Sequence, residues 1–294
     1  QCDLLSCAYA SHGDTKHVLL FPADPAECFY MSPMAFDLAE RLQTPVMVLT
    51  DLDIGMNDWM VPELEWDESY VPDRGKVYSA EDLEKIDRFC RYLDVDGDGI
   101  PYRTLPGVHP KGAYFTRGSG HDKYGRYTEG SAEYIEVVDR LLAKVESAGD
   151  HVPRPEVFGD GATGEGASSY GLVSIGGCHW AVLEARDDLA RRGINVDYLR
   201  VLAFPFNETV EEFLRSHDRI FVIEQNRDEQ LRKLLVTETG CPKTKLESIT
   251  YYGGQPLSKG HVLDGLAARL EGAPSSTTGT GEGEAETATM ETTS

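Results

Sequence analysis

Short apolar runs along the chain are each followed by a polar turn and then by an amphipathic stretch. The clearest case is residues 218–235, where the apolar run 220–223 precedes the polar turn 224–228 and leucines at helical spacing. Such a run is typical of a strand buried on both faces, and such leucine spacing is typical of a helix. Ligands of open α/β sheets bind at the carboxyl ends of strands, where these turns lie. On this stretch alone, capping of the helix explains the polar residues more simply.

The first half of the chain predicts a β-α-β unit, which should be right-handed. It consists of a helix over 3–10, a strand over 17–21, a helix over 26–42 and a strand over 45–52. Residues 53–129 are rich in Gly, Pro, Asp and aromatic residues, and they predict one helix, over 79–93, with Ser79 as N-cap. Long irregular spans inside compact domains are usually functional or form interfaces. A helix over 131–146 closes this half.

The second half predicts another parallel sheet after a Pro- and Gly-rich linker at 149–167. Strands are predicted over 170–175, 196–202, 220–223 and 245–251, and helices over 178–192, 208–216, 231–235 and 258–270. Alternating strands and helices of this length indicate a sheet covered on both faces. The sequence therefore predicts an α/β fold of two parallel-sheet α/β/α modules, residues 1–148 and 168–272, with a disordered acidic tail at 273–294.

The charge balance restricts the partners. Among 294 residues, 28 are Lys or Arg and 50 are Asp or Glu, for a net charge of −22, and removing the four glutamates of the tail still leaves −18. Such a field repels nucleic acid and anionic membranes, so neither is expected as a partner. An acidic surface also suits a salt-rich cytoplasm, where charges are strongly screened. We therefore expect a halophilic, haloarchaeal source.

Cysteine usage and hydropathy indicate the compartment. The six cysteines form no CxxC pair and no regular spacing, which predicts reduced thiols and a cytoplasmic location. The sequence has no apolar run long enough to span a membrane and no visible signal peptide. The chain begins at Gln1, next to a predicted helix, so we expect that an N-terminal part is missing.

One acidic motif is a candidate metal site. Residues 94–99, DVDGDG, resemble the start of a calcium loop, in which alternating carboxylates bind the ion and glycines allow the tight turn. Asp94, Asp96 and Asp98 are the candidate ligands. A full calcium loop needs a bidentate Glu at position twelve, where Leu105 stands. The alternative is an acidic turn held by bonds from side chains to the backbone.

Two further motifs carry no clear catalytic chemistry. Gly176 and Gly177 between a strand and a helix resemble part of a phosphate-binding turn, but close packing of helix on sheet is the simpler explanation because the full GxGxxG is absent. Cys178 and His179 are adjacent, which excludes an ordinary nucleophile and base pair. The sequence also lacks GxSxG, HExxH and Walker motifs.

Residues 115–127, FTRGSGHDKYGRY, form the most basic stretch of this acidic chain. They combine Arg117, His121, Asp122, Lys123 and Arg126 with glycines. This stretch suits an anionic cofactor or an acidic partner surface. It is equally well explained as a solvated loop whose arginines pair with nearby acids.

Four blocks in order carry a family resemblance. They are LFPADPAECFYMSPMAFDLAERLQTPVMVLTDL (20–52), DVDGDGIPYRTLPG (94–107), GAYFTRGSGHDKYGRYTE (112–129) and FVIEQNRDEQLRKLL (221–235). Together they resemble the alpha subunit of 2-oxoacid:ferredoxin oxidoreductases, particularly the 2-oxoglutarate type. The resemblance extends from residue 1 to about 270.

This resemblance implies an enzyme subunit of the EC 1.2.7 class. Family members oxidatively decarboxylate a 2-oxoacid with coenzyme A and pass the electrons to ferredoxin. Thiamine diphosphate lies between the pyrimidine-binding domain of the alpha subunit and a beta subunit, which supplies the diphosphate-binding part, Mg²⁺ and an iron–sulfur cluster. Residues 1–148 would be the C-terminal portion of the pyrimidine-binding domain, and residues 168–272 would resemble the transketolase C-terminal domain.

The resemblance carries over no catalytic residue. The activating glutamate of the family and its substrate-binding Thr and Arg motifs lie upstream of residue 20, so we expect no activity from this chain alone, and its cofactor-binding residues stay unassigned. Glu229 stands where the family usually has glycine, and Gly177-Cys178 replaces a commoner Gly-Ser. The substrate is 2-oxoglutarate or pyruvate. The alternatives are another thiamine-dependent transketolase or dehydrogenase component, against which the DVDGDG and RGSGHD blocks argue, and a non-enzymatic calcium-binding acidic module.

The charge of −22 predicts a salt dependence of stability. Lowering KCl from about 1 M to about 0.1 M lengthens the Debye screening distance from about 3 Å to about 10 Å, which strengthens repulsion between surface carboxylates. We expect the midpoint of thermal unfolding to fall. A neutral osmolyte at matched osmolality, as control, should not restore it. An unchanged midpoint across this range would rule out a halophilic protein.

Overall fold

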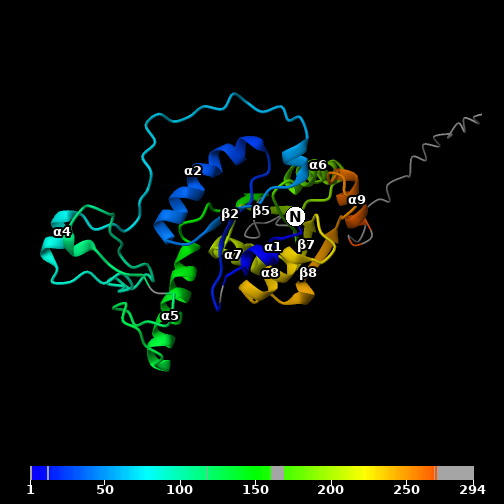
Figure 1. The fold of residues 1–294 in the computed structure, drawn as a ribbon. Coiled ribbons are helices and arrows are strands. Elements are labelled where there is room, and N and C mark those ends of the chain that lie inside the picture. Colours follow the sequence, from blue (N-terminus) through cyan, green and yellow to red (C-terminus); the bar gives the residue numbers. More distant parts are fainter. Residues whose placement is uncertain (1, 12, 117, 160–168, 268, 270–294) are drawn as a thin grey trace, which may run out of the picture.

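The computed structural model describes residues 2–11, 13–116, 118–159, 169–267 and 269, and its larger sheet confirms the predicted α/β class. The order of the five strands is β3-β5-β4-β7-β8, and neighbours from β5 to β8 are parallel (Figure 1). The bounds are β3 Glu156–Phe158, β4 Tyr170–Ile175, β5 Asp197–Val201, β7 Arg219–Glu224 and β8 Leu246–Thr250.

Alternation along the interior strand β7 divides the core into two layers. In β7, Ile220 and Val222 pack into one hydrophobic cluster, while Phe221 and Ile223 pack into another. The first cluster lies under α1 (Leu4–Ala8), α7 (Glu208–Ser216) and α8 (Gln230–Thr239), and the second lies under α6 (Cys178–Arg191) and α9 (Lys259–Ala267). Because successive side chains of a strand point to opposite faces, a wholly apolar strand requires helices on both sides.

Edge strand β3 corrects the prediction of a continuous linker at 149–167. It pairs antiparallel with β5, and the Phe158 ring stacks on Tyr198 with the ring centroids 5.3 Å apart. Three residues are too few to produce a period-two pattern, so no strand was predicted for this segment. Residues 160–168 of the predicted linker, and the predicted tail at 273–294, lie outside the described residues.

The smaller sheet joins the two halves of the chain. Its order is β2-β1-β6, in which β1 (Val18–Leu20) and β2 (Val46–Val48) are parallel, and β6 (Ala203–Phe204), from the second half, is antiparallel to β1. The predicted strands 17–21 and 45–52 thus exist but are shorter. The second one ends early because Asp51 caps α3 (Leu52–Met56), accepting a hydrogen bond from the Ile54 N–H at 3.0 Å.

The start of the chain is buried in the core of the larger sheet. Leu4, Leu19 and Phe21 are fully buried in the cluster that also contains Leu231 and Leu234 of α8. The Gln230 amide of α8 strengthens this contact, since its Oε1 accepts from the Leu5 N–H at 3.0 Å and its Nε2 donates to the Cys2 carbonyl at 2.6 Å. The core therefore combines residues from both predicted modules.

Residues 53–129 form an irregular insertion, as predicted, that lies largely apart from the sheets. After α3 the chain arches over α2 (Pro25–Leu42) before it reaches α4 (Ala80–Lys85) (Figure 1). The only other helical segment in the described part of this insertion is the 3-10 turn η1 (Pro110–Gly112), and α5 (Ser131–Ala148) follows it. A second 3-10 turn, η2 (Lys243–Lys245), precedes β8.

Helix α4 corrects the predicted helix 79–93. It begins at the predicted cap, where Ser79 and Asp82 form a reciprocal capping box, but it ends at Lys85. Beyond the end of this helix, Phe89 is buried, and its ring centroid lies 6.1 Å from that of Tyr78 and 5.5 Å from that of Tyr114. This aromatic packing overrides the helix propensity of the segment.

Glu229, at the start of α8, is in the left-handed conformation, with φ 54° and ψ 45°. This explains why glycine is expected at this position of the turn, since a side chain in this region strains the backbone.

We predict that Glu229→Gly is more stable than Glu229→Ala by about 1 kcal/mol. Both variants lose the ion pair between Glu229 and Arg232 Nη1, 2.6 Å long, but only glycine relieves the backbone. Denaturant unfolding of the two variants at one salt concentration measures the difference. Equal stability would show that the backbone at this turn is unstrained.

Candidate functional site

The polar turn after β7 uses two of its residues to begin α8. The buried Glu224 carboxylate accepts from the Leu231 N–H at 2.8 Å and from Asn226 Nδ2 at 2.9 Å, while Asn226 Oδ1 accepts from the Gln230 N–H at 3.1 Å. Burial raises the pKa of Glu224, and these hydrogen bonds oppose that effect. The simpler interpretation, helix capping, is therefore right for Glu224 and Asn226, which satisfy N–H groups that Glu229 leaves uncapped.

The other residues of this turn line a cavity of about 690 Å³ at the carboxyl ends of the strands. Gln225, Arg227 and Asp228 lie on one side of it. Asp51 and Asp53, which follow β2, line it as well, together with Tyr251 and Tyr252, which follow β8. Sequence reasoning did not assign these residues, although each lies at or just after the carboxyl end of a predicted strand, where ligands of α/β folds bind.

Asp51 connects this cavity to the glycine pair before α6. A Cβ on Gly177 would lie 2.3 Å from Asp51 Oδ2, so the carboxylate occupies space that only glycine leaves open. Asp51 Oδ2 is buried and has no hydrogen-bond partner. Gly176 has a φ of 53°. The glycine pair thus serves close packing, as the simpler explanation predicted.

Cys178 and His179 do not act on each other, in agreement with the sequence. Burial raises the pKa of the Cys178 thiol to about 12. Burial, and secondarily the Arg200 guanidinium, lowers the pKa of His179 to about 4. The His179 ring contacts the Tyr198 hydroxyl, with Nδ1 and Oη 3.1 Å apart.

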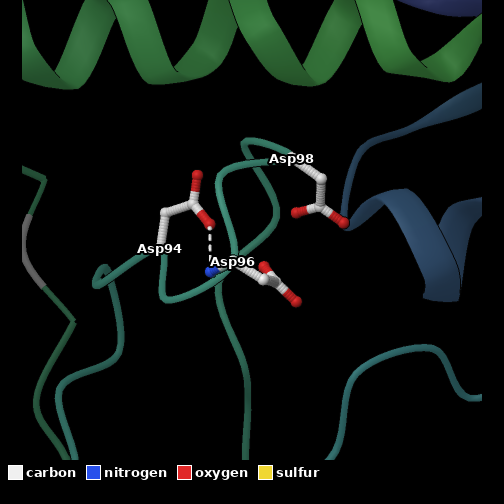
Figure 2. A group of neighbouring side chains, drawn as sticks. All are labelled: Asp94, Asp96 and Asp98. Atoms are coloured by element: carbon white, nitrogen blue, oxygen red, sulfur yellow. Dashed lines mark hydrogen bonds between the residues drawn. The ribbon is translucent and has the colours of Figure 1, made fainter.

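The three predicted metal ligands lie close together. One oxygen from each of Asp94, Asp96 and Asp98 lies within 4.8 Å of the others, and Figure 2 shows them around a single turn. Asp94 accepts from the N–H groups of Gly97 and Gly99 at 2.9 and 2.8 Å, which lower the pKa of Asp94 against the opposing effect of its burial. These bonds also form the alternative predicted for this motif, an acidic turn held by the backbone.

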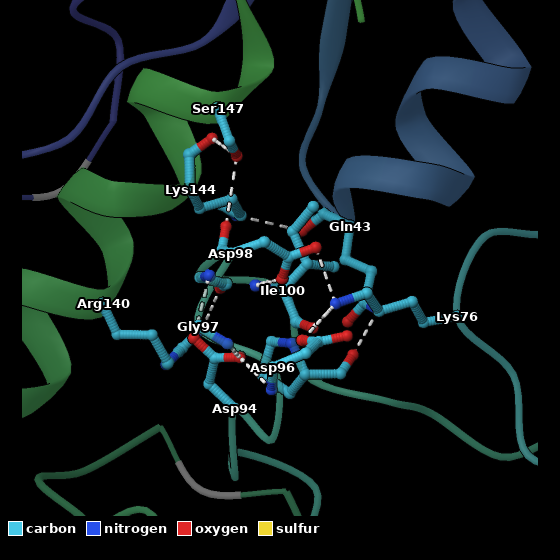
Figure 3. A network of polar contacts seen from close by, with 12 residues as sticks. Gln43, Lys76, Asp94, Asp96, Gly97, Asp98, Ile100, Arg140, Lys144 and Ser147 are labelled. Carbon is cyan, nitrogen blue, oxygen red and sulfur yellow. Dashed lines mark hydrogen bonds and ion pairs between the residues drawn. The ribbon is translucent and has the colours of Figure 1, made fainter. Parts of the chain in front are cut away.

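Lys76 already provides a positive charge to this turn. Its ammonium lies 2.5 Å from Asp96 Oδ1 and 2.6 Å from Asp98 Oδ2 (Figure 3). Burial lowers the pKa of Lys76, but the hydrogen bonds to Asp96 and Asp98 outweigh that effect and raise it above its ordinary value. A metal ion at these carboxylates would therefore compete with Lys76.

The turn is also fixed to α5. Arg140 Nη1 donates to the Gly99 carbonyl at 2.9 Å, and Ser147 Oγ donates to the Asp98 carbonyl at 3.1 Å (Figure 3). A Cβ on Gly99 would lie 2.4 Å from the backbone nitrogen of Lys144. The motif therefore anchors the insertion to the long helix, whether or not it binds a metal.

The basic stretch 115–127 has a mixed structure. Lys123 pairs with Glu136 at 2.7 Å, and Asp122 accepts from the backbone N–H groups of Tyr124 and Arg126. His121 stacks on Tyr92, with the ring centroids 3.9 Å apart. Arg117 lies outside the described residues.

Comparison with known proteins identifies the relatives. Residues 1–95 match the family described as pyruvate flavodoxin/ferredoxin oxidoreductase, thiamine diphosphate-binding. The alpha subunit of 2-oxoacid:ferredoxin oxidoreductase 2 from Aeropyrum pernix is 30% identical over 274 residues, 92% of this chain and 41% of the relative. The chain is related to the alpha subunits of 2-oxoacid:ferredoxin oxidoreductases. It spans less than half the length of this relative.

Two further known proteins are similar to this chain. The 2-oxoglutarate synthase subunit KorA of Methanothermobacter thermautotrophicus is 25% identical over 254 residues, 84% of this chain and 62% of the relative. The fold is similar to that of the 2-oxoglutarate:ferredoxin oxidoreductase from Magnetococcus marinus, with a TM-score of 0.78, 23% identity, and coverage of 91% of this chain and 45% of that one. Within the described part of the chain, no helix is long and apolar enough to cross a bilayer.

The 690 Å³ cavity does not fit a diphosphate by itself. Its lining includes the carboxylates of Asp51, Asp53 and Asp228. The cation among its lining residues, Arg227, is paired with Asp228, with Nε and Oδ1 2.7 Å apart. Carboxylates at this density repel a diphosphate, so this cavity alone does not fit thiamine diphosphate.

The predicted metal site leads to a test on Lys76. If Asp94, Asp96 and Asp98 bind Ca²⁺ or Mg²⁺, removing the competing ammonium in Lys76→Met should raise the affinity by roughly tenfold, because one unit charge no longer has to be displaced. Isothermal titration of the wild type and of this variant measures the change.

The matched control is the double variant Lys76→Met with Asp96→Asn, in which the increase in metal affinity should be lost. Circular dichroism should first show that each variant is folded. Absence of a binding heat in both the wild type and Lys76→Met would reject the metal site and leave the acidic turn.

Proposed function

We propose that the chain serves in the alpha subunit of a 2-oxoacid:ferredoxin oxidoreductase. This enzyme would oxidatively decarboxylate a 2-oxoacid with coenzyme A and reduce ferredoxin. The observation that carries the proposal is the similarity to such alpha subunits over 92% of this chain, together with the match of residues 1–95 to a thiamine diphosphate-binding family. The relatives named 2-oxoglutarate synthase favour 2-oxoglutarate over pyruvate as substrate.

The cofactor would be shared with a beta subunit. Thiamine diphosphate, when bound, supplies the carbanion that attacks the 2-oxoacid. The carboxylates around the 690 Å³ cavity support a division in which the beta subunit binds the diphosphate, Mg²⁺ and the iron–sulfur cluster. The chain would act in the cytoplasm, and alone it would be inactive.

Exposed apolar side chains on α2, α3 and the arching segment support a partner at this face. Phe36 is 73% exposed, and Leu52, Met56, Met60 and Val71 are between 77% and 100% exposed. Apolar side chains gathered on a surface in this way are typical of a subunit interface. We infer that the beta subunit covers this face.

The proposed function predicts an activity that needs two chains. The protein should be co-expressed with the candidate beta subunit from the neighbouring reading frame, in high salt and without oxygen. Reduction of a viologen dye should depend on 2-oxoglutarate, on coenzyme A and on both chains. Activity with pyruvate instead would change the substrate and keep the family. A stable complex that carries thiamine and cluster but reduces no dye with either acid would refute the proposal.

The same complex tests the interface. Phe36→Glu and Met60→Glu place a charge on the proposed contact, so each should abolish co-purification of the beta subunit. Tyr134→Glu on α5, where the tyrosine is 63% exposed, is the matched control and should keep the complex. Equal behaviour of all three variants would place the interface elsewhere.

A further inference from the structure

A second cavity, of about 460 Å³, lies within the insertion. Three segments line it: residues 87–92, which follow α4, residues 111–115, and residues 124–125 of the basic stretch. Its volume lies within the range of roughly 300 to 1,000 Å³ that is typical of small-ligand sites. None of the contacts described for the 690 Å³ cavity involves these segments.

The arginines at this cavity lack carboxylate partners. Arg88 and Arg91 line the cavity, and Arg126 lies over the ring of Tyr124, 5.4 Å from its centroid. Within the described residues none of the three forms an ion pair, and Arg91 donates instead to Gln43 Oε1 at 2.5 Å. The chain has 50 acidic and 28 basic residues, so carboxylates are in excess and these arginines are not unpaired for lack of acids.

Two more cations stand behind Arg91. Arg140 and Lys144 of α5 also form no ion pair with a carboxylate in the described part of the chain. Burial, and secondarily the charges of Arg140 and Arg91, lower the pKa of Lys144 to about 8. Positive charge is therefore concentrated on this side of the insertion, where Asp94 is the carboxylate that acts on Arg140, and this concentration favours an anion.

Aromatic side chains supply the other half of the site. Tyr114, Phe115 and Tyr124 line the cavity and are 44%, 79% and 40% exposed. Exposed rings beside arginines are the combination that binds a planar base by stacking and a phosphate by charge-assisted hydrogen bonds. A flat acidic surface of a partner protein would pair with the arginines, but it would not fill the concave cavity or stack on the rings.

We propose that this cavity binds a small ligand that carries both a phosphate group and a planar ring, as a nucleotide does. Arg88 and Arg91 bind the phosphate, and the rings of Tyr114 and Phe115 bind the base. The proposal does not rest on the oxidoreductase activity, because binding is measured on the chain without its partner.

The test compares ADP, adenosine and inorganic pyrophosphate by isothermal titration against the 294-residue chain. ADP should bind more tightly than either fragment, since it alone uses both halves of the site. Arg88→Gln should weaken ADP binding roughly tenfold or more, because a charge-assisted hydrogen bond is lost. Phe115→Ser should weaken ADP but leave pyrophosphate unchanged. Arg192→Gln, which removes the same charge at the end of α6, is the matched control and should have no effect.

Coenzyme A, which contains an adenosine diphosphate unit, forms a further arm of the titration. Tighter binding of coenzyme A than of ADP would assign the site to this co-substrate, and equal binding would assign it to free nucleotides; both support the proposal. Absence of ADP binding at millimolar concentration would overturn it and favour an acidic partner surface. Equal losses in Arg88→Gln and Arg192→Gln would also overturn it, since they would indicate a general charge effect.

Discussion

Burial of the first strand and helix against the C-terminal sheet is the contact on which the architecture depends. Leu4, Leu19 and Phe21 are fully buried there, and full burial of such a side chain contributes about 1.5 to 3 kcal/mol. This contact places β1 next to β6 and brings Asp51, at the end of the smaller sheet, against Gly177 at the start of α6. The 690 Å³ cavity forms where the two sheets meet, so it exists only when both halves are folded.

Charge is used in a consistent way to connect distant segments. Arg200, a buried residue of β5, pairs with Glu27 of α2 and Glu156 of β3, and Lys76 pairs with Asp96 and Asp98 of the insertion. Arg200 is buried, so removing both of its partners would leave a buried charge uncompensated, which is more damaging than loss of a surface pair. The arginines of the second cavity are exceptions to this use, because they form no ion pair in the described part of the chain although Asp87 lines the same cavity.

Long apolar segments were predictable, and short paired ones were not. The strand at 170–175 has the predicted bounds, because a largely apolar run can be found without knowing its partner strands. Strands β3 and β6 have three and two residues, and they exist only because β5 and β1 offer unpaired edges. Helix α4 stops early because the buried Phe89 packs on rings that are distant in sequence.

The candidate sites divide in the same way. Spacing alone placed Asp94, Asp96 and Asp98 together, since they lie on one turn. No sequence pattern predicts that Lys76 contacts them, because that contact depends on how the insertion folds back. Asp51 lies at the carboxyl end of a predicted strand and could have been found by the same rule that drew attention to the turn after β7. The second cavity combines segments 87–92, 111–115 and 124–125, which no single pattern connects.

The contact between Leu5 and Gln230 joins residues 225 positions apart, which has a consequence for biosynthesis. At a translation rate of about 5 to 20 residues per second, the apolar face of α1 leaves the ribosome about 11 to 45 s before α8 is available to cover it. During that interval the nascent chain exposes Leu4 and the neighbouring strand to solvent. A chaperone that shields this segment would therefore raise the yield of folded protein, and the early part of the chain would need protection for longer than any later one.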